Sequence, residues 1–342
     1  MKITVRRRSG ISWEAPNALY LLDMGKQRRQ VKSEPLVILV GSGVHKEILQ
    51  KEANGSPLAC WSALLRETAR RAEIPLNTLC GSSLTAAWES MVLHALVHGF
   101  RDAKGSRGRH PKQNAAEVDH ALRRVCTKVI VEESEEWRGH YQTHWITQAL
   151  RRVCEQRQVH LVEFNFDELI SGALGVRKKP RPDPVAYQQG AGLTKAEHSA
   201  LFRSWRVPGN TNSLLWKPHG WIGQPKSLRL GLRDFGLQGA GYRWAFGFHK
   251  ADQRRKAGVA IAASNTWVAR VMRHECRAIG LGLGPDEWGL HWLLTQRARE
   301  HAKKVRPEPF TVFRERRDSL PLGTLCAEFY AWPCAVRAAL SE

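Results

Sequence analysis

The sequence predicts an α/β protein built on a mostly parallel sheet, because short apolar runs alternate with helical patterns and end in glycine or polar turns. The clearest run is LVILV at 36–40, which leads directly into Gly41-Ser42-Gly43. A continuous apolar run of this length is typical of a parallel strand buried on both faces. Similar runs at 159–164 and 213–216 end in the turns NFD and KPHG. We therefore expect several strands to deliver polar residues to one edge of a sheet.

The elements of the first half are expected as follows. Residues 1–35 are basic and weakly periodic, and we interpret them as an N-terminal extension before a single domain at 36–342. A helix is expected at 57–73, where Pro57 stands at a helix-start position and apolar residues recur at helical spacing. At 82–157 we expect several helices, parted by the basic loop at 104–112 and by a polar stretch near 132–137, which together form a helical insertion. The stretch 175–213 is rich in Pro, Gly, Lys and Gln, which predicts an irregular insertion.

The second half continues the alternation. We expect strands at 228–232 and 242–248, a helix at 265–278, and a strand, glycine turn and helix within 276–302. Residues 310–316 and 322–340 predict two last strands and a terminal helix. Strands that alternate with helices in this way favour a Rossmann-like, mostly parallel sheet with helices on both faces.

Composition narrows the class of protein. Hydrophobic residues make up 42% and charged residues 25% of the 342 positions, as in ordinary globular proteins. The seven cysteines form no CxxC pair, so a zinc ribbon or a disulfide framework is not expected. With no secretory apolar stretch and no run of about 20 apolar residues for a membrane span, we expect a cytoplasmic protein.

The net charge of +21, from 53 Lys and Arg against 32 Asp and Glu, permits two interpretations. A basic chain can neutralise the phosphates of a nucleic acid, or it can attract an anionic cofactor or acidic partners. The basic clusters at 104–112, 177–183 and 303–307 all resemble loops. Solvated loops are the simpler explanation, and direct contact with nucleic acid remains open.

Four turns that follow predicted strands carry polar or small residues. In an open parallel sheet these turns lie along one edge and would converge on a single crevice. Each turn alone has a simpler explanation as a tight turn or a cap, so the prediction of a site depends on their convergence. The four turns are Gly41-Ser42-Gly43, Asn165-Phe166-Asp167, His219-Gly220 and 280–286.

Together these motifs resemble a known family. VGSGV, EFNFDEL, WKPHG, AIGLGLGPDEWGLHWLL and AEFYAWPCAV occur in that order over residues 36–340. This series is similar to the sirtuin-like domain of bacterial antiphage defence proteins. The resemblance implies a Rossmann fold, NAD as substrate, and hydrolysis of NAD to nicotinamide and ADP-ribose, which depletes NAD in an infected cell. Classical protein deacylases of this superfamily carry a four-cysteine zinc module, and this chain lacks one, so deacetylation of proteins is not expected.

The resemblance also implies roles for single residues. The family's Asn-x-Asp falls on Asn165 and Asp167, and its catalytic histidine falls on His219. Its phosphate loop corresponds to Gly41, Ser42 and Gly43, and the stretch beside the adenosine ribose corresponds to Gly280, Gly282 and Asp286. This chain departs from the family where Ser42 replaces the commoner Ala, and where Val44 and His45 replace a usual Ser.

From the chemistry, an uncharged nicotinamide is a good leaving group, so positioning and electrostatic help matter more than a strong acid. Asn165 would orient the ribose or the attacking water, and His219, neutral near pH 7, would accept a proton. Asp167 would bond the ribose or the carboxamide. No metal is expected, because the pairs His94/His98 and His140/His144 have no third ligand.

Two other functions stay open. One is a nucleic-acid-binding or nuclease component, which the charge favours, although no clustered carboxylates with a nearby lysine are present. The other is a non-catalytic sensor of NAD or ADP-ribose. The resemblance further implies control of the NAD hydrolase by homo-oligomerisation or by a separately encoded partner, such as a motor ATPase, an Argonaute-like protein or a sensor protein.

Overall fold

The structure is a computed structural model that describes residues 34–49, 56–79, 83–108, 114–176, 200–209, 212–252, 265–281, 287–301, 310–314 and 328–331. The chain divides into Met1–Ser33 and Glu34–Glu342. Most of the predicted N-terminal extension, the predicted terminal helix, Gly282 and Asp286 lie outside the described residues.

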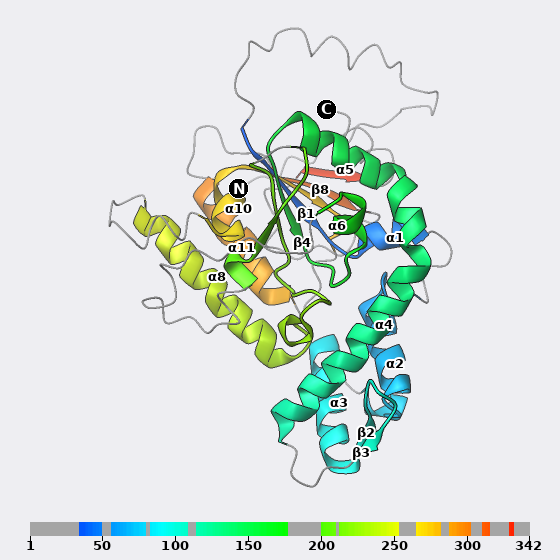
Figure 1. Ribbon diagram of the computed structural model, residues 1–342. Helices are drawn as coiled ribbons and strands as arrows, with labels where there is room; N and C mark the ends of the chain where they lie inside the picture. The colour runs from blue at the N-terminus through cyan, green and yellow to red at the C-terminus, as the bar shows by residue number, and fades with distance from the viewer. Residues whose placement is uncertain are drawn as a thin grey trace, which may run out of the picture. The chain divides into compact units, whose positions relative to one another are not determined.

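Within these residues, seven strands form one sheet in the order β5-β6-β4-β1-β7-β8-β9 (Figure 1). Every neighbouring pair is parallel except β5 and β6, which are antiparallel. The predicted α/β class with a mostly parallel sheet is therefore confirmed. The strands are β1 (Leu36–Val40), β4 (Val159–Glu163), β5 (Ser204–Arg206), β6 (Leu214–Trp216), β7 (Glu275–Ile279), β8 (Phe310–Arg314) and β9 (Glu328–Ala331).

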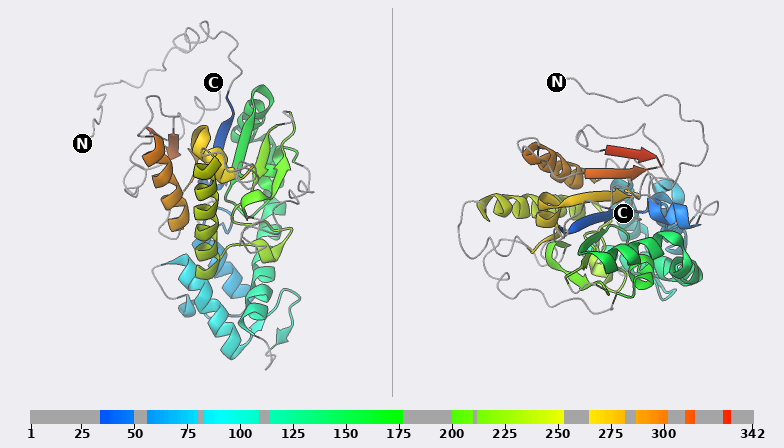
Figure 2. Two further views of the ribbon diagram at one scale, coloured as in Figure 1. Left: turned by 90° about the vertical axis from the view of Figure 1, so that its left-hand side faces the viewer. Right: turned by 90° about the horizontal axis from the view of Figure 1, so that it is seen from above.

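The helices of the first half are α1 (Gly43–Leu49), α2 (Trp61–Arg71), α3 (Leu84–His98), α4 (Ala115–Thr143), α5 (Trp145–Gln156) and α6 (Leu169–Ala173). Those of the second half are α8 (Leu232–Asp252), α10 (Trp267–Arg273) and α11 (Trp288–His301). Two 3-10 turns, η2 (Leu76–Thr78) and η4 (Pro225–Ser227), lie between them. Figure 2 shows α4 and α5 on one side of the strands and α8 and α11 on the other.

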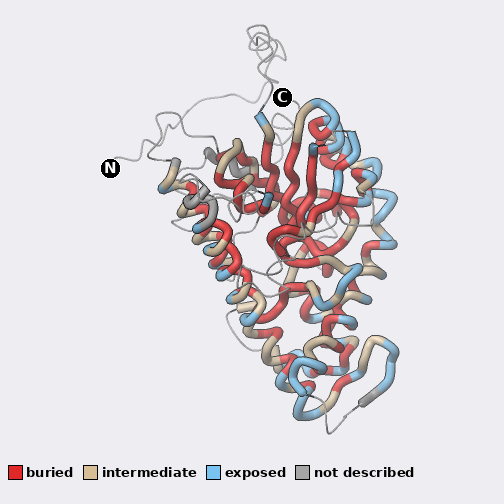
Figure 3. The backbone as a smooth tube through the Cα atoms, turned by 60° about the vertical axis from the view of Figure 1, so that its left-hand side comes forward, coloured by how far each residue is buried: buried red, intermediate tan, exposed pale blue. Residues whose placement is uncertain are grey.

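Strand β1 is the centre of the buried core, and its five residues are all buried (Figure 3). Its alternate side chains belong to two hydrophobic clusters, because successive residues of a strand point to opposite faces. Leu36, Ile38 and Val40 pack with residues of α1 to α6. Val37 and Leu39 pack with residues of α8, α10 and α11.

Over its described residues, the predicted helical insertion contains three helices and a short hairpin, β2 (Phe100–Arg101) and β3 (Arg107–Gly108). Helix α4 begins with a capping box, in which Asn114 and Glu117 each accept from the other's backbone N–H. It ends at His144, which is both the C-cap of α4 and the N-cap of α5. The 29-residue α4 packs against α2, α3, α5 and α6 and so joins this insertion to the sheet.

The helix expected at 265–278 is too long, because α10 ends at Arg273 and Glu275–Ile279 form β7. Two predicted strands are wrong altogether. Residues 228–232 are not a strand, and residues 242–248 lie inside α8. Glycines between residues 228 and 248 resemble turn signals in the sequence, but one of them, Gly239, instead allows α8 and α11 to pack closely. A Cβ on Gly239 would stand 2.2 Å from the ring of Trp288. Strand β5 was also missed, because it is a three-residue edge strand inside the segment expected to be irregular.

Candidate functional site

The turns after four parallel strands come together at one edge of the sheet, as the sequence predicts. Register pairs Val40 with both Glu163 and Ile279 across neighbouring strands, and Val162 with Trp216. Gly41 and Gly280 directly follow their strands, and Asn165 and His219 follow within a few residues. The described turns therefore lie at the same edge of the sheet, and the single crevice expected between them stays a prediction.

The loop Gly41-Ser42-Gly43 packs backbone to backbone against the turn after β7. The Gly41 N–H donates to Ile279 O at 3.0 Å, and the Gly43 N–H donates to Gly280 O at 2.8 Å. A Cβ on Gly43 would stand 2.7 Å from the Gly280 Cα, which leaves no room for a side chain. The amides of both glycines are thus engaged within the protein. Ser42 is the exposed residue of the loop.

Asn165 and Asp167 occupy the turn between β4 and α6, and both are buried. The Asn165 Nδ2 donates to Gly41 O at 3.5 Å, a long contact that joins this turn to the glycine loop. Asp167 Oδ1 accepts from the Leu169 N–H at 2.8 Å, and Oδ2 lies 2.9 Å from His45 Nε2. Both carboxylate oxygens of Asp167 therefore already have partners.

His45 connects three elements through a buried chain of contacts. It lies in α1, its Nε2 pairs with Asp167, and its Nδ1 is in hydrogen-bond contact with the Tyr141 hydroxyl on α4. Burial alone would raise the pKa of Asp167, but His45, Lys217 and the Leu169 amide outweigh it and lower that pKa. Burial and the nearby carboxylates raise the pKa of Tyr141. We conclude that Asp167 is an ionised anchor for α1.

Lys217 is a buried cation directly behind the same turn. Its Nζ lies 2.8 Å from Glu163 Oε2, donates to Asn165 O at 3.4 Å, and also donates to Asp167 O. Its side chain is 2% exposed and that of Glu163 is fully buried. Burial raises the pKa of Glu163 to about 7, although Lys217 opposes this. One ammonium group thus binds two backbone oxygens of the Asn165–Asp167 turn.

His219 is buried among aromatic rings. Its ring lies 4.9 Å from Phe164 and 5.4 Å from Phe235, both edge-on. Burial lowers its pKa to about 3, a hydrogen bond to the Phe164 backbone opposes this, and Arg229 lowers it further. The expectation of a neutral histidine at pH 7 agrees with this environment.

The loop after His219 is tightly fixed. The Arg229 N–H donates to His219 O at 2.8 Å. Gly220 has φ +92°, and a Cβ there would stand 2.1 Å from Ser227 O. Only glycine fits this position, so the histidine's place depends on its neighbour as much as on its own contacts.

Four residues of this arrangement were not predicted as site residues, namely His45, Tyr141, Glu163 and Lys217. A signal for two of them was present, because Glu163 and Lys217 are charged residues at the ends of otherwise apolar strands. A charge at such a position is buried and needs a partner. His45 and Tyr141 are 96 positions apart, and their contact could not be read from the sequence.

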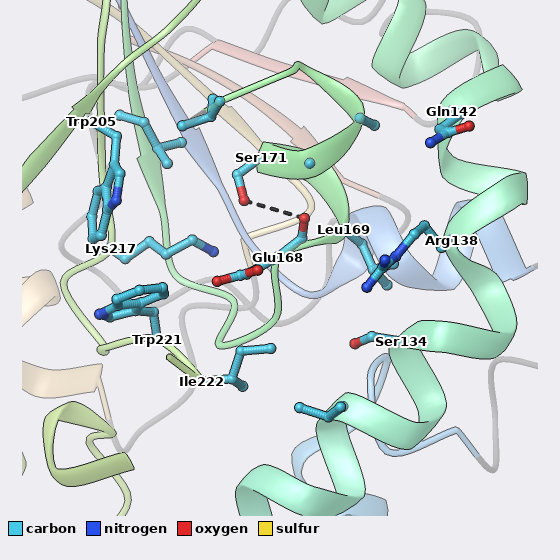
Figure 4. A pocket seen from close by; sticks show the side chains of 15 residues that line it. Ser134, Arg138, Gln142, Glu168, Leu169, Ser171, Trp205, Lys217, Trp221 and Ile222 are labelled. Carbon is cyan, nitrogen blue, oxygen red and sulfur yellow. Dashed lines mark hydrogen bonds between the residues drawn. The ribbon is translucent and has the colours of Figure 1, made fainter. Parts of the chain in front are cut away.

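Two cavities lie beside this turn, on the side of Lys217. The first, which we call the α4 cavity, has a volume of about 270 Å³. Figure 4 shows Lys217 and Glu168 extending into it, with Arg138 of α4 on the opposite wall. The second, the basic cavity, measures about 250 Å³ and shares Trp205, Lys217 and Trp221 with the first. Neither is lined by Gly41, Gly43, Asn165 or His219.

Other features of the described residues are simpler. They contain no group of three or more His, Cys, Asp or Glu side chains that could hold a metal ion. The rings of His94 and His98 lie 4.6 Å apart on α3. None of the described helices is both long and apolar enough to cross a membrane.

Comparison with known proteins adds no assignment. No protein-family model matches the chain, and no curated protein matches its sequence.

Proposed function

We propose that this chain is a sirtuin-like NAD hydrolase. The observation that carries the proposal is the strand order. Numbered along the chain, the parallel strands β6-β4-β1-β7-β8-β9 run 3-2-1-4-5-6, the order typical of dinucleotide-binding folds. In this proposal the sheet is Rossmann-like with helices on both faces, which the two clusters around β1 support.

The position of the turns supports the same ligand. Ligands of open α/β sheets bind outside the carboxyl ends of the strands, where the strand order reverses. Here the reversal falls between β1 and β7, where the loop Gly41–Gly43 meets Gly280. We therefore place the pyrophosphate of NAD beside Ser42, the exposed residue of that loop, with Gly282 and Asp286 proposed for the adenosine ribose.

In the proposed reaction, the oxygen of water bonds to the ribose carbon as the bond to nicotinamide breaks. The bonding electrons leave with nicotinamide, which becomes neutral, and one proton from water passes to solvent. Asn165 orients the ribose or the water. His219 accepts a hydrogen bond from a ribose hydroxyl or from the water, since a pKa of about 3 leaves it uncharged but weakly basic.

The expected role of Asp167 changes under this proposal. Its carboxylate is paired with His45 and with the Leu169 amide. We therefore assign Asp167 and Lys217 to holding the turn that carries Asn165, and we leave contact with the substrate to Asn165 and His219.

A second function, a non-catalytic sensor of NAD or ADP-ribose, is favoured by one observation. Asn165 and His219 are 6% and 5% exposed, so the site is closed around the groups that would react. As a hydrolase, the protein would serve as a cytoplasmic antiphage effector that depletes NAD. Its closed site fits control by self-assembly or by a separately encoded partner that opens the turns.

The test is calorimetric titration of NAD together with measurement of nicotinamide. The hydrolase proposal predicts NAD binding and nicotinamide release that Asn165→Ala and His219→Ala both abolish, while His98→Ala, on the exposed end of α3, leaves release unchanged. Binding of NAD without release, alone and with the products of neighbouring genes, would favour the sensor. Neither binding nor release under any of these conditions would reject both.

A further inference from the structure

The lining of the basic cavity carries an excess of positive charge. Among the described residues that line it, four side chains are cationic, none is a carboxylate, and two indole rings complete the walls. The cations are Arg203, Lys217, Lys226 and Arg229, and the rings belong to Trp205 and Trp221. Strand β5, the turn after β6 and η4 contribute these residues, so the cavity is formed by segments that the fold holds together independently of a ligand.

Two of the four cations are already balanced. Lys217 is paired with Glu163, and the Arg229 guanidinium lies 3.6 Å from Asp234. Arg203 donates to the neutral side-chain oxygen of Gln224. Among the described residues, neither Arg203 nor Lys226 forms an ion pair. The cavity therefore carries positive charge that a bound anion would neutralise.

The aromatic walls specify a second property of the ligand. Trp205 and Trp221 meet edge-on, with ring centroids 5.5 Å apart at 72°, so they form a fixed corner (Figure 4). Flat rings are bound by such aromatic surfaces.

We infer that the basic cavity binds a nucleoside phosphate, with the phosphate at Arg203 and Lys226 and the base against the tryptophans. Its volume of about 250 Å³ lies just below the usual range of ligand pockets, which fits a mononucleotide better than a dinucleotide. Part of the chain's excess positive charge thereby has a specific use.

This site differs from the one proposed for NAD, because none of Gly41, Gly43, Asn165 and His219 lines it. The two are nevertheless neighbours. The loop 217–229 lines the basic cavity with Gly220, Trp221 and Arg229, and Arg229 also donates its N–H to His219 O. A nucleotide in the cavity would therefore contact the loop that fixes His219.

The inference is tested by titrating the full-length protein with trinitrophenyl-ATP and following its fluorescence. The double variant Arg203→Gln/Lys226→Gln should bind the probe about a hundredfold or more weakly, since each charge-assisted hydrogen bond contributes about tenfold or more. The matched control Lys104→Gln/Arg152→Gln removes the same charge from two exposed positions outside the cavity and should bind as the parent does. Trp221→Leu, which removes the aromatic ring from the wall, should weaken binding to a smaller extent.

Competing ligands show which chemical features of the probe the cavity recognises. AMP or ATP should displace the probe, whereas saturating NAD should not. The inference is wrong if the probe does not bind, if both double variants weaken it equally, or if NAD displaces it. It is also wrong if inorganic phosphate competes as well as ATP, or if a single-stranded oligonucleotide binds through Arg203 and Lys226 in place of a mononucleotide. The titration needs no nicotinamide release, so it stands or fails separately from the proposed hydrolysis.

Discussion

Replacing Lys217 with Met tests whether one buried ammonium holds the turn that carries Asn165. The substitution keeps an unbranched side chain, one atom shorter, but removes the charge 2.8 Å from Glu163 and the donor to Asn165 O and Asp167 O. Breaking a buried ion pair costs about 3–5 kcal/mol, because the remaining charge is left without a partner. We expect the free energy of unfolding to fall by about that amount at pH 8.

The matched double variant Lys217→Met/Glu163→Gln separates charge from positioning. It removes both charges of the Lys217–Glu163 pair, so the main remaining loss is that of the two hydrogen bonds to backbone oxygens, at about 1 kcal/mol each. Most of the stability should return, whereas nicotinamide release should stay low because the turn has lost its donor. Recovery of both would mean that Lys217 matters only for stability.

The stability lost in Lys217→Met should change with pH in a definite direction. The folded-state pKa of Glu163 is raised to about 7, so the native protein holds a proton that the unfolded chain releases. Stability from this group is present below its unfolded pKa and falls as pH rises toward 7. Without Lys217 that pKa should rise further, so the cost of Lys217→Met should grow between pH 6 and pH 8.

Urea unfolding followed by circular dichroism at both pH values measures these changes. A loss below about 1 kcal/mol for Lys217→Met, within the range of an exposed ion pair, would refute the reasoning. A double variant no more stable than the single one would refute it as well.

Three further predictions concern the neighbouring residues. Gly43→Ala should lower the free energy of unfolding by about 1–3 kcal/mol through overpacking against Gly280. Gly139→Ala, in open space on α4, should raise it by about 0.5–1 kcal/mol. Urea unfolding measures both, and equal effects would contradict the loop packing. The parent should lose stability as pH falls from 6.5 toward 3, because the buried His219 stays neutral while the histidine of the unfolded chain protonates. His219→Gln should remove this contribution, which is up to about 1.4 kcal/mol per pH unit. An unchanged acid limb of the stability–pH curve would contradict this. Asp167→Asn should lower the thermal midpoint, and adding His45→Gln should recover part of the loss; full additivity would show that the two side chains are not coupled.

The sheet could be predicted from the sequence because its strands are continuous apolar runs ending in polar turns. The run at 36–40 became β1 with the same bounds, and that at 159–164 became β4, one residue shorter. Helix α8 could not be predicted, because its several glycines resemble turn signals in the sequence. One of them, Gly239, allows close packing against Trp288 of α11, whereas Gly236 and Gly247 face open space. The edge strand β5 was too short to show a period.

The site could be predicted only in outline. The convergence of Gly41, Asn165, His219 and Gly280 follows from the parallel order of the strands. The partner of Asp167 does not, because His45 reaches it only after α1 packs on the turn. Local patterns show which residues end a strand, whereas the neutralisation of a buried charge depends on contacts distant in sequence.

The central claim is tested most directly by quantifying nicotinamide and ADP-ribose after NAD is incubated with the purified protein, alone and with the products of neighbouring genes. The proposal predicts equimolar nicotinamide and ADP-ribose from the parent and from His98→Ala, and neither product from Asn165→Ala. Intact NAD in every parent reaction, or equal product from Asn165→Ala and the parent, would contradict it.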